Sequence, residues 1–572
     1  MSEPVYEFDA AIWRRRLRVA QGAEPADLVL SGGAVVNVLS GETYPADVAI
    51  ADGFIAGVGA YPAARERIDV TGHWIVPSFI DAHVHTESAL VWLPEFARAV
   101  VPYGTGTIVT DPHELANIAG LPGLAAMREA ARGLPLDILF TVPSCVPASA
   151  WESAGAEFGP AEMRQMLRWP ECVGVGELMN FPGVLAGDDD IAAKLAVSGR
   201  ARREGHAPGV RGAALQAYVG SGITSDHEST AYDEALEKLR AGQMVMIRDA
   251  SSARNLEALL PLVTDATYPR CCFCSDDRDV HSLLHEGHLD VTLRQAIALG
   301  LDPIRAIRLA TWNAADYWRL NGLGAVAPGY HANLAILSDL REVRVAMTLH
   351  AGRVVAREGA IVDDAMGGEM LIPATLRDSM HLAPLSLADL RLAPDAARQA
   401  VGVMPGEITT RLLDVEPETR DGWAAAAPER DLLKLVCVER HHATGRAGVG
   451  YVQGFGLRRG ALASSISHDA HNIVAVGADD ADLLAAIATV GESGGGLAAV
   501  AGGQIVAQMS LPIAGILSDR PLPEVAAAYG AMEEAARGLG SELPSPFGLL
   551  AFLALSVIPE ARVTDRGFVR VG

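Results

Sequence analysis

The feature that most constrains the fold is a series of eight short, mostly apolar runs between residues 74 and 274. Runs of four to eight apolar residues that alternate with helical patterns are typical of βα units and a parallel sheet. The simplest closed arrangement of eight such units is a (β/α)8 barrel of the TIM type. The fifth run is highly charged, and we place a strand there because the other seven leave one gap. The eight runs are residues 74–80, 106–109, 138–142, 172–175, 200–204, 221–224, 244–247 and 271–274.

The segments on either side of this series have a different pattern. Residues 25–76 and 325–370 alternate short β-branched runs with turn residues, which predicts strands joined by hairpins. We expect these two segments to combine into one composite β domain beside a barrel at residues 77–324. Residues 1–24 predict an N-terminal helical segment, and residues 371–572 a C-terminal α+β domain. The predicted fold class is therefore α/β with two additional domains.

Composition and charge exclude several classes of protein. The chain has 46 basic and 70 acidic residues and a net charge of −24, so the basic face of a nucleic-acid-binding protein is not expected. No apolar run reaches the length of a membrane-spanning helix, and residues 547–558 are interpreted as a buried core segment. Six cysteines in 572 residues do not form a disulfide framework. We therefore expect a cytoplasmic enzyme without nucleic-acid or membrane partners.

Polar residues follow most of the predicted strands, and active sites of such barrels lie at the C-terminal strand ends. His83 and His85 share one face of their strand because side chains alternate along a strand. Four imidazoles and two carboxylates are too many for one tetrahedral zinc ion and suit two divalent ions that share a bridging carboxylate. The sequence therefore predicts a two-metal hydrolytic site. Its candidate ligands are His83, His85, Glu177, His206, His227 and Asp276.

Further polar residues have more than one interpretation. His113 and Glu114 follow the second run, where they either bind substrate and support the site or form the first turn of the next helix. His468 and His471 are interpreted as a third metal site, as a lid over the active site, or as surface histidines. The C-x-x-C spacing in residues 271–274 favours a buried strand over structural zinc. Candidate substrate-binding residues are Glu228, Arg248, His468 and His471.

Several motifs together resemble the amidohydrolase superfamily and, more narrowly, its adenine deaminase family. The resemblance covers nearly the whole chain after residue 24, including the C-terminal domain. Two departures from the family pattern are Ser78 in place of glycine and Asp249-Ala250 in place of Glu-Gly. The motifs are PSFIDAHVHTES at 77–88, TDPHE at 110–114 with Ala116-Asn117, GELMN at 176–180, GHAPG at 205–209, SDHE at 225–228, DDR at 276–278, SHDAHN at 467–472 and LPIAG at 511–515.

The resemblance implies an amidohydrolase-type barrel and a role for each candidate residue. His83 and His85 would hold one ion, His206 and His227 the other, and Glu177 would bridge them. Asp276 would bind the first ion and transfer protons, with His113 and Glu114 as further catalytic residues. The implied metals are manganese or ferrous iron, with zinc as an alternative. The implied reaction is hydrolysis of adenine to hypoxanthine and ammonia in purine salvage, which agrees with attack by a metal-activated hydroxide on an electron-poor ring carbon.

Three alternatives stay open at this point. A cyclic amidohydrolase of the dihydroorotase or hydantoinase type would bridge its metals with a carboxylated lysine, whereas the fourth run ends in Glu177 with no lysine nearby. A barrel that has lost catalysis would lack ligands, but all six positions are filled. The third alternative is another aminopurine, or a pterin, as the substrate. Because many such barrels pair, we expect a homodimer or a larger homo-oligomer.

Overall fold

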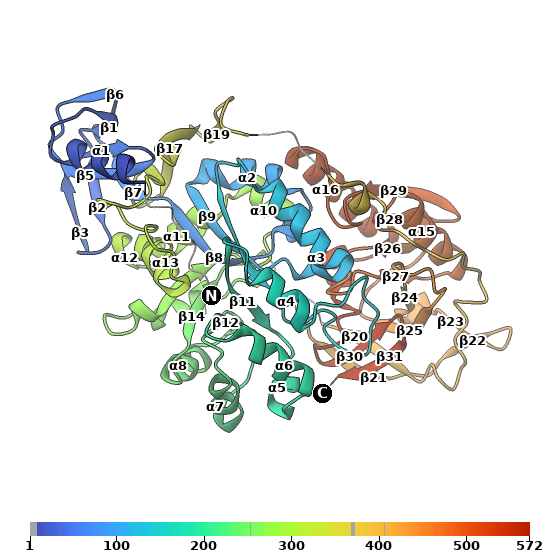
Figure 1. Cartoon of the computed structure of the whole chain (residues 1–572). Coiled ribbons are helices and arrows are strands. Elements are labelled where there is room, and N and C mark those ends of the chain that lie inside the picture. The colour runs from blue at the N-terminus through green and yellow to red at the C-terminus, as the bar shows by residue number, and fades with distance from the viewer. Residues whose placement is uncertain (1–8, 252, 368–371, 405–406, 572) are drawn as a thin grey trace.

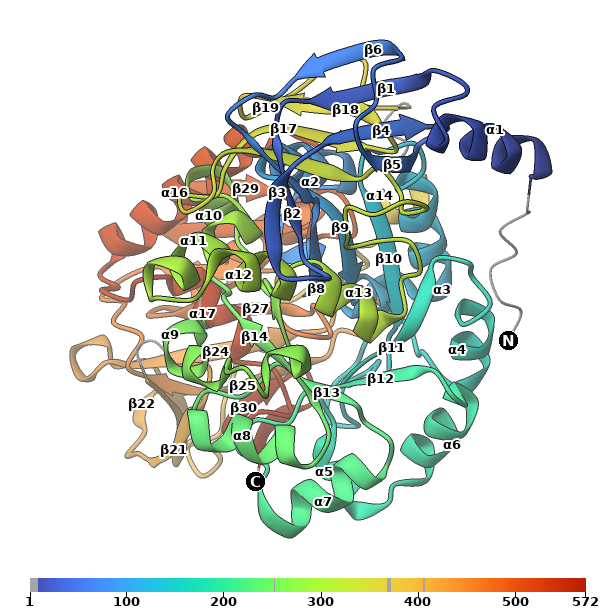
Figure 2. The same ribbon diagram turned by 90° about the vertical axis from the view of Figure 1, so that its left-hand side faces the viewer.

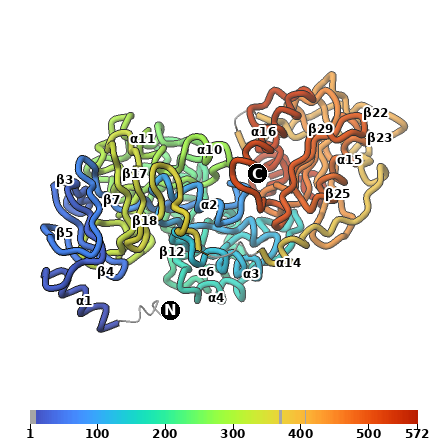
Figure 3. The backbone as a smooth tube through the Cα atoms, turned by 90° about the horizontal axis from the view of Figure 1, so that it is seen from above, coloured from blue at the N-terminus to red at the C-terminus, as the bar shows by residue number. Residues whose placement is uncertain are grey.

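The computed structural model describes residues 9–251, 253–367, 372–404 and 407–571. The chain has three parts that lie side by side, with the N-terminal sheets at one end, a parallel α/β part in the middle and the C-terminal part at the other end (Figures 1 and 3). The start of the predicted N-terminal segment, residues 1–8, and the predicted domain boundary at residues 370 and 371 lie outside the described residues, as does residue 572.

The N-terminal part consists of one helix and two sheets that use strands from both flanks of the chain. Helix α1 (Ala10–Ala20) begins where the side chain of Asp9 accepts hydrogen bonds from two backbone amides. In the second sheet, β16 runs antiparallel to β7, which joins strands from the two flanks. The first sheet has the order β5 (Phe54–Gly59), β4 (Asp47–Ala51), β1 (Ala26–Ser31), β6 (Ala64–Asp69), and the second β19 (Ala360–Ile361), β18 (Arg353–Arg357), β17 (Arg344–His350), β16 (Leu334–Asp339), β7 (Trp74–Pro77), β2 (Ala34–Asn37), β3 (Glu42–Pro45).

The middle part contains two parallel sheets that meet at both edges (Figure 2). At one junction Thr224 N donates to Arg203 O over 2.9 Å, and at the other Asp276 N donates to His83 O over 3.0 Å. The five-stranded sheet has the order β12 (Arg202–Gly205), β11 (Cys172–Leu178), β10 (Asp137–Val142), β9 (Thr105–Thr110), β8 (Phe79–Val84), and the three-stranded sheet β13 (Ser225–Asp226), β14 (Met244–Arg248), β15 (Cys271–Cys274).

Helices follow most of these strands. They cover the outside of the two parallel sheets, as Figure 2 shows. Their bounds are α2 (Leu93–Val100), α3 (His113–Ala130), α4 (Pro160–Met166), α5 (Phe181–Ala186), α6 (Asp189–Ser198), α7 (Gly212–Gly220), α8 (Tyr232–Arg240), α9 (Leu256–Leu259), α10 (Val280–His285), α11 (Leu289–Ala298), α12 (Pro303–Leu309) and α13 (Trp312–Trp318).

Two predicted strands have different bounds in the structure. The first run is not one strand, because β7 ends at Pro77 and pairs in the N-terminal sheet, while β8 begins at Phe79 and pairs with β9. Ser78 separates them and donates its backbone N–H to Asn333 O. The sixth strand lies after the predicted run, at Ser225–Asp226, since α7 occupies the chain up to Gly220. The apolar run therefore locates the sixth strand only to within a few residues.

The charged fifth strand is confirmed as β12, and its charges have separate partners. Arg203 faces outwards and donates to the carbonyls of Leu195, Gly199 and Ser221 at the C-terminal ends of α6 and α7. Arg202 donates to Tyr317 O. These contacts allow a strand without apolar side chains to occupy this position, because each charged group has partners that replace water.

The C-terminal part is an eight-stranded mixed sheet with helices, as the α+β pattern predicts. The first half of the apolar run at 547–558 lies in a short helix, α17 (Pro546–Phe552). No helix among the described residues is long and apolar enough to cross a membrane. Two more helices are α15 (Asp480–Glu492) and α16 (Leu522–Leu539), and α14 (Ala374–Arg377) precedes the sheet. The strand order is β21 (Thr410–Asp414), β20 (Gln399–Val403), β25 (Ala447–Gln453), β24 (Leu432–Val438), β27 (Ile473–Gly477), β26 (Ala461–Ser464), β28 (Gly496–Ala501), β29 (Gln504–Ser510), with the hairpins β22 (Glu418–Arg420), β23 (Trp423–Ala425) and β30 (Glu560–Thr564), β31 (Gly567–Val571).

A loop of the middle part anchors the C-terminal part. Ser153 donates its backbone N–H to Asp565 Oδ1 over 2.9 Å, and Asn472 Nδ2 donates to Ser153 O over 2.8 Å. The neighbouring Glu152 is 3% exposed, and its Oε1 has no hydrogen-bond partner among the described residues. Burial, together with the nearby carboxylate of Asp469, raises the pKa of Glu152 from 4.5 to about 8. The contact between the two parts thus contains a carboxyl group that favours its neutral form.

The raised pKa makes the stability of this contact dependent on pH. Between pH 4.5 and 8 the unfolded chain loses the Glu152 proton and the folded chain keeps it, so the free energy of unfolding falls by up to about 1.4 kcal/mol per pH unit. Glu152→Gln removes this loss. We expect the variant to gain thermal stability over the parent chain progressively from pH 5 to 8, measured as unfolding midpoints. Glu157→Gln, exposed in the same loop, is the control, and a pH-independent difference for Glu152→Gln would contradict the prediction.

Candidate active site

Three of the predicted metal ligands lie together where β8 and β15 end. His83 Nε2 is 3.0 Å from His85 Nε2, and His85 Nε2 is 3.2 Å from Asp276 Oδ1. Asp81 supports this arrangement, because it accepts hydrogen bonds from Ser275 N and from His83 N. His83, His85 and Asp276 are all at least 95% buried. These three side chains form one compact set of donor atoms.

A second set gathers around Glu177 at the end of β11. His227 Nε2 is 3.1 Å from Glu177 Oε2, and His206 Nδ1 contacts the same oxygen. The other oxygen, Oε1, is 3.5 Å from His85 Nε2, so Glu177 lies between the two sets. Asp111 Oδ2 fixes the position of Glu177 by accepting its backbone N–H over 2.8 Å. This approach requires glycine at position 176, since a Cβ there would lie 2.0 Å from the same Asp111 oxygen.

The donor atoms of the two sets fit divalent metal ions. Imidazole nitrogens and carboxylate oxygens are the ligands that zinc, manganese and iron accept in proteins. His227 Nε2 is buried, faces Glu177 and has no hydrogen-bond partner among the described residues. A buried nitrogen in this state is costly unless it binds something. The six predicted ligands are therefore brought together in an arrangement that suits two ions.

Glu228 and Arg248, predicted as substrate-binding residues, lie beside these sets. Arg248 NH1 donates to Asp276 Oδ2 over 2.7 Å and also pairs with Glu228. Burial raises the pKa of the Asp276 carboxyl, but the Arg248 guanidinium and His83 outweigh it and hold this pKa well below its usual value. Arg248 therefore keeps Asp276 ionised and holds one of its oxygens, which leaves Oδ1 facing the histidines.

His113 and Glu114 form the first turn of α3, so the helix-start interpretation is correct, and both also face the site. His113 Nδ1 is 3.7 Å from Glu177 Oε1. Glu114 Oε1 is 2.6 Å from Nδ1 of His468, which comes from the C-terminal part. The first turn of α3 therefore links the candidate metal ligands to the C-terminal part.

His468 and His471 are not surface histidines. His471 is fully buried, and its Nδ1 accepts the backbone N–H of Ser467. Its Nε2, 3.7 Å from Glu114 Oε2, therefore carries the ring hydrogen and lacks the lone pair that a metal would need. Burial, with the nearby His468, lowers the pKa of His471 to about 3, against the opposing effect of Glu114. Of the three interpretations, the geometry favours a lid contribution, which His468 provides.

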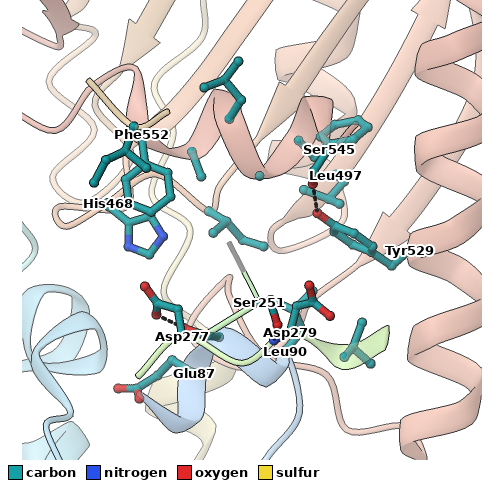
Figure 4. A pocket seen from close by; sticks show the side chains of 18 of the residues that line it. Glu87, Leu90, Ser251, Asp277, Asp279, His468, Leu497, Tyr529, Ser545 and Phe552 are labelled. Carbon is teal, nitrogen blue, oxygen red and sulfur yellow. Dashed lines mark hydrogen bonds between the residues drawn. The ribbon is translucent and has the colours of Figure 1, made fainter. Parts of the chain in front are cut away.

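A cavity of about 370 Å³ lies between the middle part and the C-terminal part. Figure 4 shows Glu87 and Asp277 on one side of it, with His468 and Phe552 opposite. The His468 and Phe552 rings stack with centroids 4.4 Å apart and an interplanar angle of 17°. Burial and the neighbouring Glu114 carboxylate raise the pKa of Glu87 to about 7. The cavity thus has a carboxylate-rich side from the strand ends and an apolar, aromatic side from the C-terminal part.

Comparisons with known proteins identify the family of this chain. The amidohydrolase family profile matches residues 74–355, and that of the adenine deaminase C-terminal domain matches residues 407–572. The adenine deaminase of Dehalococcoides mccartyi strain 195 is 44% identical over 97% of both chains, and that of Syntrophobacter fumaroxidans is 43% identical over 99% of this chain and 98% of the relative. The chain belongs to the adenine deaminase family. Among solved structures, a Xanthomonas campestris adenosine deaminase with bound zinc covers 59% of this chain and 95% of its own, at 15% identity and a TM-score of 0.46.

The sequence analysis did not single out several residues that lie at the candidate active site or its cavity. Glu87 and Asp277 stand inside the quoted motifs, directly after predicted strands, and that position was the available signal. Phe552 gave no signal, because a phenylalanine in an apolar run is typical of any core. Glu204 lies in the charged fifth run, where a glutamate is expected at the surface. In the structure it is fully buried beside His83 and His227.

The position of Glu177 between the two sets leads to a prediction on metal content. We expect Glu177→Gln to lower the manganese content of reconstituted protein from about two ions per chain to one or fewer, because an amide offers one neutral oxygen in place of two that share a negative charge. Atomic emission after dialysis measures the content. Glu129→Gln, on the exposed face of α3, is the control. Two ions retained in Glu177→Gln would show that this carboxylate does not join the two sets.

Proposed function

We propose that this chain hydrolyses adenine to hypoxanthine and ammonia at a binuclear metal centre. The observation that carries the proposal is 44% identity to an adenine deaminase over 97% of both chains. The six candidate ligands and the adjoining cavity support it. We further propose that the two parallel sheets together constitute the eight-stranded barrel typical of amidohydrolases, because hydrogen bonds link them at both edges.

We assign His83, His85 and Asp276 to one ion, His206 and His227 to the other, and Glu177 to both. Two divalent ions, when held by these residues, would lower the pKa of a water molecule enough to supply a nucleophile at neutral pH. We propose manganese or ferrous iron as the native ions, because both accept mixed imidazole and carboxylate ligands, with zinc as the alternative.

We assign the proton transfer to Asp276. Its Oδ1 faces the histidines, while Arg248 holds Oδ2 at 2.7 Å. The carboxylate takes a proton from the attacking water and delivers it to the departing nitrogen, so that adenine and water yield hypoxanthine and ammonia. His113 and Glu114 act beside it, Glu114 at the cavity and His113 next to Glu177.

The chemistry of the cavity favours an aminopurine over an anionic cyclic amide such as dihydroorotate. Five carboxyl groups line the cavity, namely Glu87, Glu114, Asp277, Asp279 and Glu407. Carboxylates accept hydrogen bonds from the N–H groups of an aminopurine and repel an anion such as dihydroorotate. The stacked rings of His468 and Phe552 offer a flat surface to a planar base. Adenine is our first choice, and another aminopurine is the alternative.

The oligomeric state and the cellular location stay predictions. We expect a homodimer or a larger homo-oligomer, and we expect it in the cytoplasm, as for an amidohydrolase-type metabolic enzyme.

Ammonia release tests the proposed reaction. Manganese-reconstituted protein is offered adenine, guanine, cytosine, adenosine and dihydroorotate separately. We expect release from adenine, abolished by chelation and restored by added manganese. Because opening the dihydroorotate ring releases no ammonia, its loss is followed by chromatography. Turnover of dihydroorotate in place of adenine, or no turnover of any substrate by protein that holds two ions, would rule out adenine deamination.

The aromatic side of the cavity gives a second prediction. Phe552→Ala removes the ring that stacks on His468 and holds it in place, and such aromatic pairs contribute about 0.5–1.5 kcal/mol. We expect KM for adenine to rise about tenfold with a smaller change in kcat, measured by steady-state kinetics. Trp423→Ala, at an exposed hairpin of the C-terminal part, is the control. An unchanged KM in Phe552→Ala would show that adenine binds elsewhere.

A further inference from the structure

Glu204 is a fully buried carboxylate beside the candidate metal centre, and the mechanism proposed above does not use it. It lies on β12 directly after Arg203, whose side chain reaches the carbonyls at the helix ends outside. Because side chains alternate along a strand, Glu204 points to the opposite, inner side. A buried carboxylate is costly unless other groups pair with it, so its partners reveal its role.

The two oxygens of Glu204 contact two different histidines. Oε2 is 3.0 Å from His83 Nδ1, and Oε1 is 3.4 Å from His227 Nδ1. None of these four buried atoms has a hydrogen-bond partner among the described residues, so these ion-pair contacts are the polar contacts they have. The two imidazole rings stack, with centroids 4.2 Å apart and an interplanar angle of 18°. Glu204 therefore lies across one end of a pair of parallel rings.

The opposite nitrogens of the same rings face the two ligand sets. His83 Nε2 is 3.0 Å from His85 Nε2, in the first set, and His227 Nε2 is 3.1 Å from Glu177 Oε2, in the second. A neutral imidazole carries its hydrogen on one nitrogen and a lone pair on the other. A carboxylate beside both Nδ1 atoms favours the hydrogen there, which leaves both Nε2 lone pairs directed at the ions.

We propose that Glu204 is a positioning residue that sets the tautomer and orientation of His83 and His227 together, and so couples the binding of the two ions. The proposal rests on the two-ion centre of the proposed function. Carboxylates behind ligating histidines orient the ring and raise its basicity, and their loss lowers metal affinity about 10- to 100-fold. Here a single carboxylate serves one ligand of each ion.

The shared contact gives Glu204→Gln a specific consequence. A glutamine side chain has the same size, but it offers one acceptor oxygen and one donor NH2 group. It can accept the Nδ1 hydrogen of only one ring. The other ring has to present its Nδ1 lone pair to the amide, and its Nε2 then carries the hydrogen and cannot bind an ion. Glu204→Asp keeps two acceptors on a shorter side chain.

Equilibrium dialysis of the chelated full-length chain against manganese tests the proposal. We expect the parent chain to bind two ions, and Glu204→Gln to bind one of them at least about tenfold more weakly. Glu204→Asp is expected to bind two ions with both affinities reduced together. Glu257→Gln, an exposed change on α9, is the control. Circular dichroism and the unfolding midpoint without metal report whether each variant folds.

Two outcomes would overturn the proposal. One is a folded Glu204→Gln chain that binds both ions with the affinity of the parent. The other, which decides the matter if Glu204→Gln does not fold, is a Glu204→Asp chain in which neither affinity changes or only one does. Because the readout is metal binding, its outcome is separate from that of the ammonia assay. A chain that binds two ions but does not deaminate adenine would exclude the proposed function and leave the role of Glu204 standing.

Discussion

The candidate site depends on one constraint, which is that ionisable groups removed from water need partners of opposite charge or a metal. Imidazoles and carboxylates alternate through the interior from Glu204 to His83 and His85, and from there to Asp276 and Arg248. In this series Glu204 and Asp276 each have a histidine or an arginine within 4 Å. This alternation lets the strand ends bring charged side chains together, and it holds the nitrogen lone pairs close enough to share ions.

The same constraint explains the scaffold behind the site. Lys238 is fully buried, and its ammonium group donates to Asp226 Oδ1 over 2.7 Å and to Ala207 O over 2.8 Å. Asp226 in turn accepts the backbone N–H of Ala207 over 3.1 Å. These contacts join the segment that carries His206 to the strand that carries His227. The Lys238 ammonium group also donates to Glu234 Oε1 over 2.8 Å. The relative position of two candidate ligands is thus fixed by a buried cluster of one lysine and two carboxylates.

The strands and the candidate metal ligands could be predicted from the sequence because both leave local patterns. Apolar runs mark buried strands, and the polar residues that follow them mark the strand ends, which is how His83, Glu177 and Asp276 were identified as candidates. Two parts of the site could not be predicted. Glu204 interrupts the apolar pattern. Its role follows from contacts with His83 and His227, which lie 121 positions before it and 23 after it. Phe552 reaches the cavity through packing between distant parts of the chain, which no short window of sequence records.

The two sides of the cavity suggest a division between chemistry and recognition. The ligands and Asp276 follow strands of the middle part, whereas His468 and Phe552 come from the C-terminal part and face the carboxylates from the opposite side. Glu114 connects the two sides, because it begins α3 and contacts His468 Nδ1 at 2.6 Å. A small shift of the loop at 467–472 would move the stacking surface and leave the metal ligands in place. Substrate choice can therefore change through the C-terminal part without disturbing the alternating charges on which the metal centre depends.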